Sequence, residues 1–457
     1  MSRSLIPPSV TSFAKRGKRF PWAFGPRFFL LLLMGLVWVG PAFTEPRFLY
    51  AMLVWDVLAL AAWVADLGKL PRPEQIAVTR TWTAPAALSL PTRLELTLHN
   101  HSSKTMRARM LDNVPIALRP EAPDSELVVG PHKDSSAWYD IFPKQRGNVS
   151  LGAVYIRYQS PLRIAESWAV ANLEQHICVY PNLREAQQHS IYLIRSRQID
   201  LEKRYSRIRG FGREFESLRE YREGDELRDV CWSATARRGK WITRLYQIER
   251  SQIIWLVVDC GRLMRTQIGG LSKLDYAVNA ALSLAQVALG SGDRVGLLAY
   301  GQKVRHRVLP YRGSAHLRQL MDCLAVVREE GAEADHLHAA STLLSSQKRR
   351  SLIVWLTDLA ETAMTPEVID AASQMTSRHL VVFVVIGQPD LEELANKAPV
   401  SVSAMYLTAA AQELTQRREV LLAKVRQHGV HTVEVSSSRV STAVVNAYLE
   451  LKGRNRL

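Results

Sequence analysis

The 457-residue sequence has few cysteines, and they form no pattern that would organise a fold. Its four cysteines are Cys178, Cys231, Cys260 and Cys323, and no two of them make a Cys-x-x-Cys pair. A chain of this length does not need a disulfide scaffold to stabilise its core. We therefore expect reduced and mostly buried thiols, which are typical of a cytosolic setting.

The sequence also lacks a recognisable catalytic or cofactor-binding pattern. The run Gly-Phe-Gly at 210–212 lacks the third spaced glycine of a dinucleotide-binding loop and follows no apolar strand. His99, His101 and His132 do not have the spacing of metal ligands, which indicates surface residues. No residue is therefore predicted to be catalytic.

Acidic residues are outnumbered by basic ones, so the formal net charge is +16 and the pI is about 9.8. Such a balance is found in proteins that bind nucleic acid, anionic lipid or acidic partners. No groove-reading motif is present, so nucleic acid is not an expected partner. Part of the charge lies in residues 1–27, which contain Lys and Arg but no Asp or Glu.

Two apolar runs follow this basic leader. They cover residues 28–43 and 48–67, and a short polar break at 44–47 separates them. A helix needs about 20 apolar residues to cross a bilayer, and so short a break joins antiparallel neighbours. The sequence therefore predicts a two-helix transmembrane hairpin over 28–68. The alternatives are a cleaved signal peptide, which the long leader and second span disfavour, and a buried soluble helix pair, which would be amphipathic.

The distribution of basic residues predicts the orientation of this hairpin. The leader, Lys69 and Arg72 are positive, whereas the loop between the spans has one charge of each sign. Residues 1–27 are therefore expected to form a basic cytoplasmic tail, and the bulk of the chain is expected to be cytoplasmic. Asp56 lies within the second span, where a carboxylate is costly. Three explanations stay open for Asp56: a functional role, protonation of its carboxyl group, or pairing across an oligomer interface.

Residues 75–185 have a period of two. Runs such as IAVTRTW and TRLELTLHN alternate apolar and polar side chains, and turn-forming residues separate them. Several short strands at this spacing predict a β-rich domain of the antiparallel sandwich type. Nothing in this region resembles a catalytic set.

Residues 251–450 have a different pattern, in which continuous apolar strands alternate with helical segments. The pattern predicts an α/β domain with a parallel, doubly wound sheet. In such a sheet the functional residues lie at the carboxyl ends of the strands, where Asp259 and Asp358 are placed. The expected strands are 253–258, 294–300, 304–309, 351–356 and 379–386.

This architecture resembles the von Willebrand factor type A domain. That family often binds Mg²⁺ through an Asp-x-Ser-x-Ser element, together with a Thr and an Asp from later loops. Here Asp259 begins the run DCGRL, which replaces both serines, and Ala334 stands where the Thr is expected. The resemblance therefore implies a degenerate metal site of Asp259, Asp335 and Asp358, with Mg²⁺ as the only candidate cofactor. The alternative is that Asp259 and Asp358 cap helices or pair with nearby Arg.

The segment 186–250, between the two domains, is dense in Arg, Glu and aromatic residues. Phe215, Leu218 and Tyr221 are spaced by three, which predicts a short helical turn with charge pairs. The sequence of residues 241–246, WITRLY, predicts a strand. The carboxylates of Glu214, Glu216, Glu220 and Asp225 each have an Arg nearby in the sequence, which would depress their pKa, so we expect salt-bridged structure and not acid–base chemistry.

The run GFGREFESLREYREGDELRDVCW at 210–232, continued by the strand at 241–245, resembles the bacterial domain-of-unknown-function family 58. The order of membrane spans, β-domain, motif and type A domain resembles that family too. The resemblance implies the bacterial inner membrane and a MoxR-type AAA+ ATPase as partner, because members are typically encoded beside such ATPases. It carries over no catalytic residue. The residues expected to contact a protein partner are Glu214, Glu216, Arg219, Glu220, Tyr221, Gly224, Asp225, Arg228 and Trp232.

Three hypotheses of function follow. In the first, the chain is a membrane-anchored, non-enzymatic adaptor or scaffold that presents a cytoplasmic surface to the ATPase or to a client protein. In the second, it is a metal-dependent hydrolase or transferase that uses the strand-end carboxylates. In the third, its positive surface binds an anionic polymer or lipid with strong salt dependence. The membrane hairpin, the polar and aromatic motif and the missing catalytic set favour the first.

Overall fold

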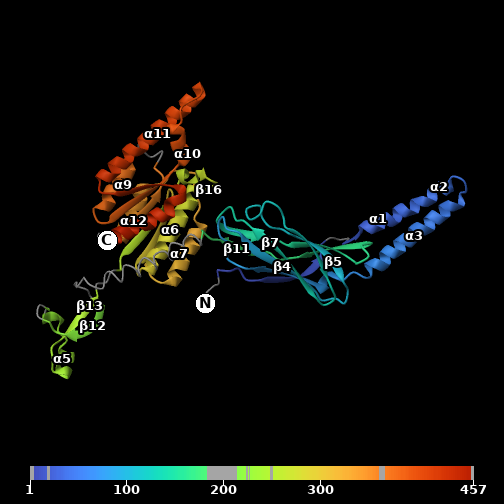
Figure 1. The fold of residues 1–457 in the computed structure, drawn as a ribbon, viewed down its shortest axis with the longest axis horizontal. Helices are drawn as coiled ribbons and strands as arrows, with labels where there is room; N and C mark the ends of the chain where they lie inside the picture. The colour runs from blue at the N-terminus through green and yellow to red at the C-terminus, as the bar shows by residue number, and fades with distance from the viewer. Residues whose placement is uncertain are drawn as a thin grey trace. The chain divides into compact units, whose positions relative to one another are not determined.

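The chain divides into two compact units, Met1–Asn182 and Leu183–Leu457. Figure 1 shows strands and a helix pair in the first unit, and helices around a sheet in the second. This confirms the predicted multidomain organisation with a β-rich N-terminal region. The computed structural model describes residues 5–17, 21–182, 214–222, 225, 227–247, 251–359 and 366–453.

The β-rich unit is built on a nine-stranded sheet with the order β6-β5-β9-β10-β1-β3-β4-β7, in which β2 also pairs with β10. A separate antiparallel ladder joins β8 and β11. Leu94, Leu96 and Leu98 alternate with more exposed residues and are buried, which confirms the period-two prediction for this strand. The strands are β1 (Val10–Arg16), β2 (Trp22–Phe24), β3 (Ile76–Trp82), β4 (Thr92–Asn100), β5 (Met106–Asp112), β6 (Asp124–Val129), β7 (Asp134–Ile141), β8 (Gly147–Leu151), β9 (Val154–Gln159), β10 (Ala165–Ala171) and β11 (Gln175–Val179).

The leader takes part in this sheet, which corrects the prediction that residues 1–27 form a tail. Strand β1 lies between β3 and β10 and pairs with both, and Ala14 is the register partner of Ala171. Without β1, the edges of β3 and β10 that now pair with it would have unpaired main-chain N–H and C=O groups. Basic composition does not predict this pairing, because side chains such as Lys15 stay exposed while the main chain forms the ladder.

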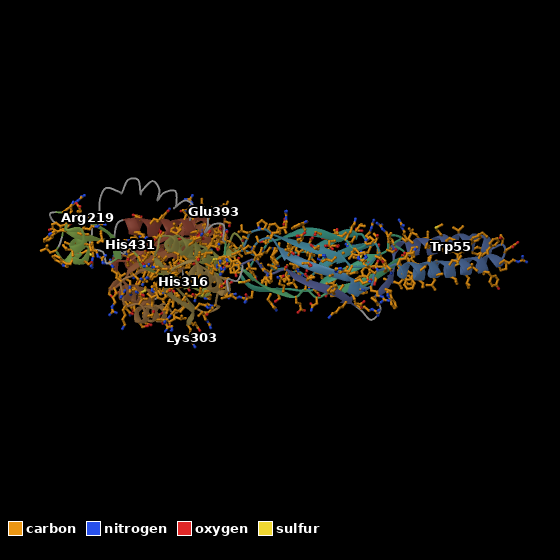
Figure 2. The ribbon with its side chains drawn as sticks, turned by 90° about the horizontal axis from the view of Figure 1, so that it is seen from below. Trp55, Arg219, Lys303, His316, Glu393 and His431 are labelled. Carbon is orange, nitrogen blue, oxygen red and sulfur yellow. The ribbon has the colours of Figure 1, made fainter. Side chains whose placement is uncertain are left out.

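Two apolar helical segments leave the sheet after β2 and return to it at β3 (Figure 1). The first comprises α1 (Pro26–Gly35), η1 (Leu36–Trp38) and α2 (Val39–Ala42), and the second is α3 (Arg47–Leu67). Among the helices in the described part of the chain, α3 alone is long and apolar enough to cross a membrane. The segments pack closely at Gly35, where a Cβ would lie 2.7 Å from Cδ1 of Trp55, a residue labelled in Figure 2.

Polar contacts join the C-terminal end of α3 to the sheet. Asp66 is 1% exposed, and its carboxylate accepts hydrogen bonds from Ser160 Oγ at 2.7 Å and from the main-chain N–H of Ala165 at 2.8 Å. Lys104 Nζ donates to the carbonyl oxygen of Gly68 at 2.6 Å. A cation at a helix C-terminus is favourable, because the last carbonyl groups carry partial negative charge. The helix pair and the sheet are therefore held together by specific contacts.

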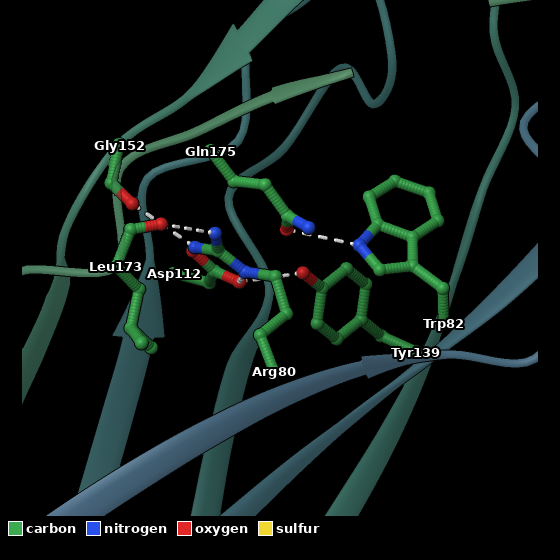
Figure 3. A network of polar contacts seen from close by, with 7 residues as sticks. All are labelled: Arg80, Trp82, Asp112, Tyr139, Gly152, Leu173 and Gln175. Atoms are coloured by element: carbon green, nitrogen blue, oxygen red, sulfur yellow. Dashed lines mark hydrogen bonds and ion pairs between the residues drawn. The ribbon is translucent and has the colours of Figure 1, made fainter. Parts of the chain in front are cut away.

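A buried ion pair lies inside the β-domain (Figure 3). Arg80 on β3 and Asp112 on β5 both have fully buried side chains, with 2.5 Å between Nη2 and Oδ1. Arg80 also donates to the carbonyl oxygens of Leu173 at 2.7 Å and Gly152 at 3.0 Å. The Tyr139 hydroxyl donates to Asp112 Oδ2 at 2.5 Å, and burial, followed by the charge of Asp112, raises the pKa of Tyr139. This network links several strands and is structural.

The C-terminal unit contains a six-stranded sheet with the order β18-β17-β14-β19-β20-β21. All neighbours in it are parallel except β17 and β18. Its strands are β14 (Ile253–Asp259), β17 (Arg294–Tyr300), β18 (Val304–Tyr311), β19 (Leu352–Thr357), β20 (Leu380–Gly387) and β21 (His431–Ser436). The helices are α6 (Lys273–Gly290), α7 (Ser314–Val326), α8 (His336–Ser346), α9 (Pro366–Thr376), α10 (Pro389–Asn396), α11 (Val402–Gln427) and α12 (Val440–Gly453).

Side chains on both faces of this sheet are buried. On β14, Trp255 and Val257 belong to a core cluster that includes residues of α8, α9 and α11. Leu256 and Val258, which point to the opposite face, are also buried, and α6 contacts β14 and α12. Successive side chains of a strand point to opposite faces, so burial of both sets explains the continuous apolar run in the sequence.

The motif contains a two-stranded antiparallel ladder of β12 (Glu214–Glu220) and β13 (Ile242–Gln247), with η3 (Leu227–Asp229) and α5 (Trp232–Arg238) between them. We call these four elements the β12–β13 unit. The strand predicted at 241–246 is confirmed as β13, but the helical turn predicted from Phe215 and Leu218 is wrong. The register shifts between Phe215 and Ser217, and a bulge of this kind inserts one residue. Side chains on one face of a regular strand are two residues apart in the sequence. The inserted residue increases this separation to three at the bulge, which resembles the period of a helix.

Candidate functional site

The β12–β13 unit exposes a group of aromatic side chains. The ring centroid of Trp241 is 5.6 Å from that of Tyr221 and 6.0 Å from that of Trp232. Trp232 is 63% exposed and Trp241 is 50% exposed. Large aromatic residues contribute much of the binding energy at protein interfaces, where their apolar area leaves water. Tyr221, Trp232 and Trp241, below called the aromatic cluster, are therefore a candidate protein-binding surface.

Hydrogen bonds to Asp225 hold the turn beside this cluster. Arg219, labelled in Figure 2, donates from Nη2 to Asp225 Oδ1 at 2.6 Å. The main-chain N–H of Arg222 donates to Asp225 Oδ2 at 3.0 Å, and the Tyr221 hydroxyl donates to the Asp225 carbonyl oxygen at 3.2 Å. The bond from Arg219, followed by that from Arg222, lowers the pKa of Asp225. Arg219 and Asp225 are therefore positioning residues for Tyr221.

The other predicted contact residues are placed less closely. Glu220 pairs with Lys240 at 3.2 Å, but both side chains are exposed, so this pair adds little to stability. The structure thus brings four of the predicted residues together, namely Arg219, Tyr221, Asp225 and Trp232. Of the rest, the main chains of Glu214 and Glu216 lie in β12, that of Arg228 lies in η3, and Gly224 lies outside the described residues.

The sequence prediction omits two residues of this unit, Trp241 and Cys231. Cys231 is 6% exposed, and its Sγ lies 3.5 Å from Ser233 Oγ. Contacts with Ser233 and then with Arg244 lower the pKa of the Cys231 thiol to about 7. No motif or spacing in the sequence marks either residue, because pairing of β12 with β13 creates their surroundings.

A second candidate site lies at the carboxyl edge of the α/β sheet. The strands β14 and β19 are parallel neighbours, so Asp259, which ends β14, and Asp358, which follows β19, lie at the same edge. Thr357 Oγ1 donates to Asp259 Oδ2 at 2.6 Å, and the Gly261 main-chain N–H donates to Oδ1 at 2.7 Å. Burial raises the pKa of Asp259, because its charged form loses contact with water.

This edge also holds a lysine that the sequence prediction omits. Lys273 is the first residue of α6 and is 1% exposed, and its Nζ donates to Asp358 Oδ2. Gln388 Oε1 accepts from the same ammonium group at 3.5 Å. A helix N-terminus carries partial positive charge, so a buried ammonium group there is unfavourable unless a carboxylate compensates it. Asp358 provides that compensation.

The residues at this edge do not fit the Mg²⁺ that the type A resemblance implies. Mg²⁺ requires oxygen ligands in a near-octahedral array, but both oxygens of Asp259 and Oδ2 of Asp358 already accept hydrogen bonds. Asp335 caps the N-terminus of α8. At Gly261 a Cβ would lie 2.9 Å from the Ala334 Cβ, so a serine ligand would require the main chain to move. Within the described part of the chain, no group of three or more His, Cys, Asp or Glu residues is placed to hold a metal.

Comparison with known proteins finds a family model that matches part of the chain, and relatives without an assigned activity. The model of the family described as Protein of unknown function DUF58 matches residues 217–429. Uncharacterized protein Mb1516 of Mycobacterium bovis and Uncharacterized protein Rv1480 of Mycobacterium tuberculosis are each 29% identical to this chain over 153 residues. The match covers 33% of this chain and 48% of each relative, so the chain spans about half the length of the curated relatives it matches.

Several solved structures show distant similarity. The conserved hypothetical protein BatB from Bacteroides thetaiotaomicron is 13% identical, with a TM-score of 0.31, over 45% of this chain and 99% of that chain. The SpRpn10 VWA domain is also 13% identical, with a TM-score of 0.26, over 42% of this chain and 94% of that chain. An uncharacterized membrane spanning protein from Vibrio fischeri is 14% identical, with a TM-score of 0.16, over 44% and 96%. Similarities with such low TM-scores support no functional conclusion.

Proposed function

We propose that this chain, whose residues 217–429 match the model of the DUF58 family, is a membrane-anchored, non-enzymatic adaptor that presents a protein-binding surface. The observation that carries the proposal is the aromatic cluster, in which Trp232 and Trp241 are exposed and Tyr221 is half-buried beside Trp241. The hydrogen bonds to Asp225 hold the turn of Tyr221 before a partner arrives. A surface that is ordered in advance loses less conformational entropy on binding.

The chemistry of the cluster suggests the kind of partner. Arg237 and Arg238 end α5, Lys240 follows them, and all three are exposed. Aromatic residues and Arg are enriched at protein interfaces. We therefore propose a protein partner with an acidic surface and an apolar pocket for Trp232 or Trp241. A MoxR-type AAA+ ATPase is the proposed partner on the basis of the family resemblance, and a client protein is the proposed second one.

We further propose that residues 26–67 anchor the chain in the bacterial inner membrane. The helix α3 has a length of 21 residues, and side chains such as Leu53 and Val57 are more than half exposed, as expected of a helix that faces lipid. Strands β2 and β3, which flank the helix pair, belong to one sheet. Both ends of the pair would then lie on one side of the membrane, which supports a hairpin, and Lys69 favours the cytoplasmic side.

The binding proposal is tested with the full chain in lipid nanodiscs and a purified MoxR-type ATPase. Trp232→Ala and Trp241→Ala are each expected to weaken binding roughly 30-fold, because loss of an interface hot-spot residue costs about 2 kcal/mol. Trp138→Ala is the matched control, because Trp138 is 52% exposed and lies on β7 of the β-rich domain, away from the aromatic cluster in the sequence. Its Kd is expected to stay unchanged.

Two outcomes contradict this proposal in different ways. Equal binding by wild type, Trp232→Ala and Trp241→Ala would refute the aromatic cluster as the contact surface. Failure of the wild-type chain to bind the ATPase, with and without ATP, would refute the proposed partner. The hydrolase hypothesis is not retained as a second proposal, because Thr357 and Lys273 already occupy the strand-end carboxylates.

A further inference from the structure

We infer that the ammonium group of Lys273 replaces a metal ion at the carboxyl edge of the α/β sheet, so that this edge is closed without a divalent cation. The residues themselves do not fit Mg²⁺, as shown above for Asp259, Gly261 and Asp335. A side chain of the protein now supplies the positive charge. The inference concerns the α/β domain alone and holds whether or not the aromatic cluster binds a partner.

The charges at this edge require a cation. Asp259 and Asp358 end neighbouring parallel strands and are 3% and 2% exposed. Two carboxylates so deep in the protein are unfavourable unless a positive group or hydrogen-bond donors compensate them. Asp259 receives neutral donors from Thr357 and Gly261, whereas Asp358 receives the ammonium group of Lys273. Lys273 is therefore a cation in direct contact with Asp358.

The ammonium group connects segments that are far apart in the sequence. Lys273 begins α6, Asp358 follows β19, and Gln388 precedes α10. An ammonium group has three donors, and Asp358 and Gln388 accept two of these bonds. A bound metal ion joins loops in the same way through its ligands. Unlike a metal ion, this cation is covalently part of the chain and is not removed by a chelator.

The position of Lys273 is set by the cap of its own helix. Ser272 is the N-cap of α6, its Oγ accepts from the Asp275 main-chain N–H at 3.2 Å, and the Asp275 side chain accepts from the Ser272 main-chain N–H at 3.0 Å. This reciprocal arrangement is a capping box, which fixes the first turn of a helix. The capping box therefore fixes the main chain at Lys273 independently of any ligand, and packing of α6 on the sheet brings this residue to Asp358.

The test uses the full chain, and its readout is the thiol of Cys260. This residue follows Asp259 and is 1% exposed, so maleimide labels it only when the edge opens. Mass spectrometry separates its labelling from that of the other cysteines. The wild-type labelling rate is expected to be the same in Mg²⁺, Mn²⁺ and EDTA. Lys273→Ala in EDTA is expected to label about 100-fold faster, because the buried Asp358 carboxylate loses the ammonium group that now donates to it.

Added Mn²⁺ is expected to slow the labelling of Lys273→Ala in a saturable way, because the lost ammonium group leaves space and uncompensated charge. The double variant Lys273→Ala/Asp358→Asn lacks that charge, so it is expected to label more slowly than Lys273→Ala and to ignore Mn²⁺. The double variant also keeps the test available if Lys273→Ala does not fold. Lys303→Ala removes an exposed lysine of the same domain and is expected to behave like wild type.

Three results would overturn the inference. The first is a wild-type chain whose Cys260 is protected by Mg²⁺ and loses this protection in Asp358→Asn, since that would show a native metal site. The second is a Lys273→Ala variant that labels at the wild-type rate. The third is a Mn²⁺ response that persists in Lys273→Ala/Asp358→Asn, since the ion would then bind away from Asp358.

Discussion

Replacing Arg80 by Met should strongly destabilise the β-domain. Met keeps part of the apolar stem of Arg80 but removes the guanidinium group. The Asp112 carboxylate, fully buried, would then keep the Tyr139 hydroxyl at 2.5 Å but lose its cationic partner. The carbonyl oxygens of Leu173 and Gly152 would also lose donors that now lie at 2.7 Å and 3.0 Å.

The size of the effect follows from this set of lost contacts. Removing one partner of a buried ion pair costs about 3–5 kcal/mol, because the other charge stays in a region of low dielectric constant. This range includes the loss of most of the associated hydrogen bonds, so we expect about 4 kcal/mol for Arg80→Met. A domain is stable by only about 5–15 kcal/mol. The β-domain of the variant would therefore be close to unfolding.

Hydrogen exchange measured by mass spectrometry on the full chain resolves this effect by domain. A loss of about 4 kcal/mol corresponds to roughly 1,000-fold faster exchange in peptides from β3 and β5, provided that these strands exchange by unfolding of the domain. Peptides from β14 are the internal control. The matched variant is Arg93→Met, because Arg93 pairs with Asp140 at 3.2 Å in the same domain but both side chains are exposed. Loss of such a pair costs about 0–1 kcal/mol.

The reasoning is refuted if Arg80→Met and Arg93→Met accelerate exchange equally, or if Arg80→Met accelerates it less than about tenfold, an amount equal to about 1.4 kcal/mol. A further variant separates the charge from the packing. Arg80→Met/Asp112→Leu removes both charges, and it should exchange more slowly than Arg80→Met because no carboxylate is left buried and unpaired. Faster exchange in the double variant would mean that lost packing, and not lost charge balance, causes the effect.

Two further predictions concern Cys231 and Asp66. The lowered pKa of Cys231 means that half of its thiol is ionised at about pH 7, so the pH profile of its alkylation by iodoacetamide should have its midpoint there, and Ser233→Ala should move the midpoint upward. An identical midpoint in Ser233→Ala would contradict the assigned cause. Asp66→Leu leaves the Ser160 hydroxyl without its acceptor, at about 1–3 kcal/mol, and should speed hydrogen exchange in residues 160–165. Asp56→Leu, a control on the same helix, should leave these residues unchanged.

Local periodicity in the sequence was enough to predict the class of most segments. Alternation at 92–100 predicted the strand β4, and the apolar run at 253–258 predicted β14 with Asp259 at its end. These predictions needed no knowledge of a partner, because the direction of successive side chains is a property of the strand itself.

Pairing between distant segments could not be predicted in this way. Strand β1 lies between β3 and β10 through main-chain hydrogen bonds, which any side chain permits. The bulge between Phe215 and Ser217 depends on the register of β12 with β13, and it produces a spacing that favours the wrong structure. The surroundings of Trp241 and Cys231 depend on the same register.

The carboxyl edge of the α/β sheet shows both contributions in one place. The sequence by itself determined that Asp259 and Asp358 end apolar strands. Only the tertiary structure decided what neutralises them, because Lys273 precedes Asp358 by 85 residues and meets it only when α6 packs on the sheet. A lysine at the start of a helix has no sequence signature as the partner of a distant carboxylate. Its role follows from the burial of both groups, which makes an unpaired charge too costly.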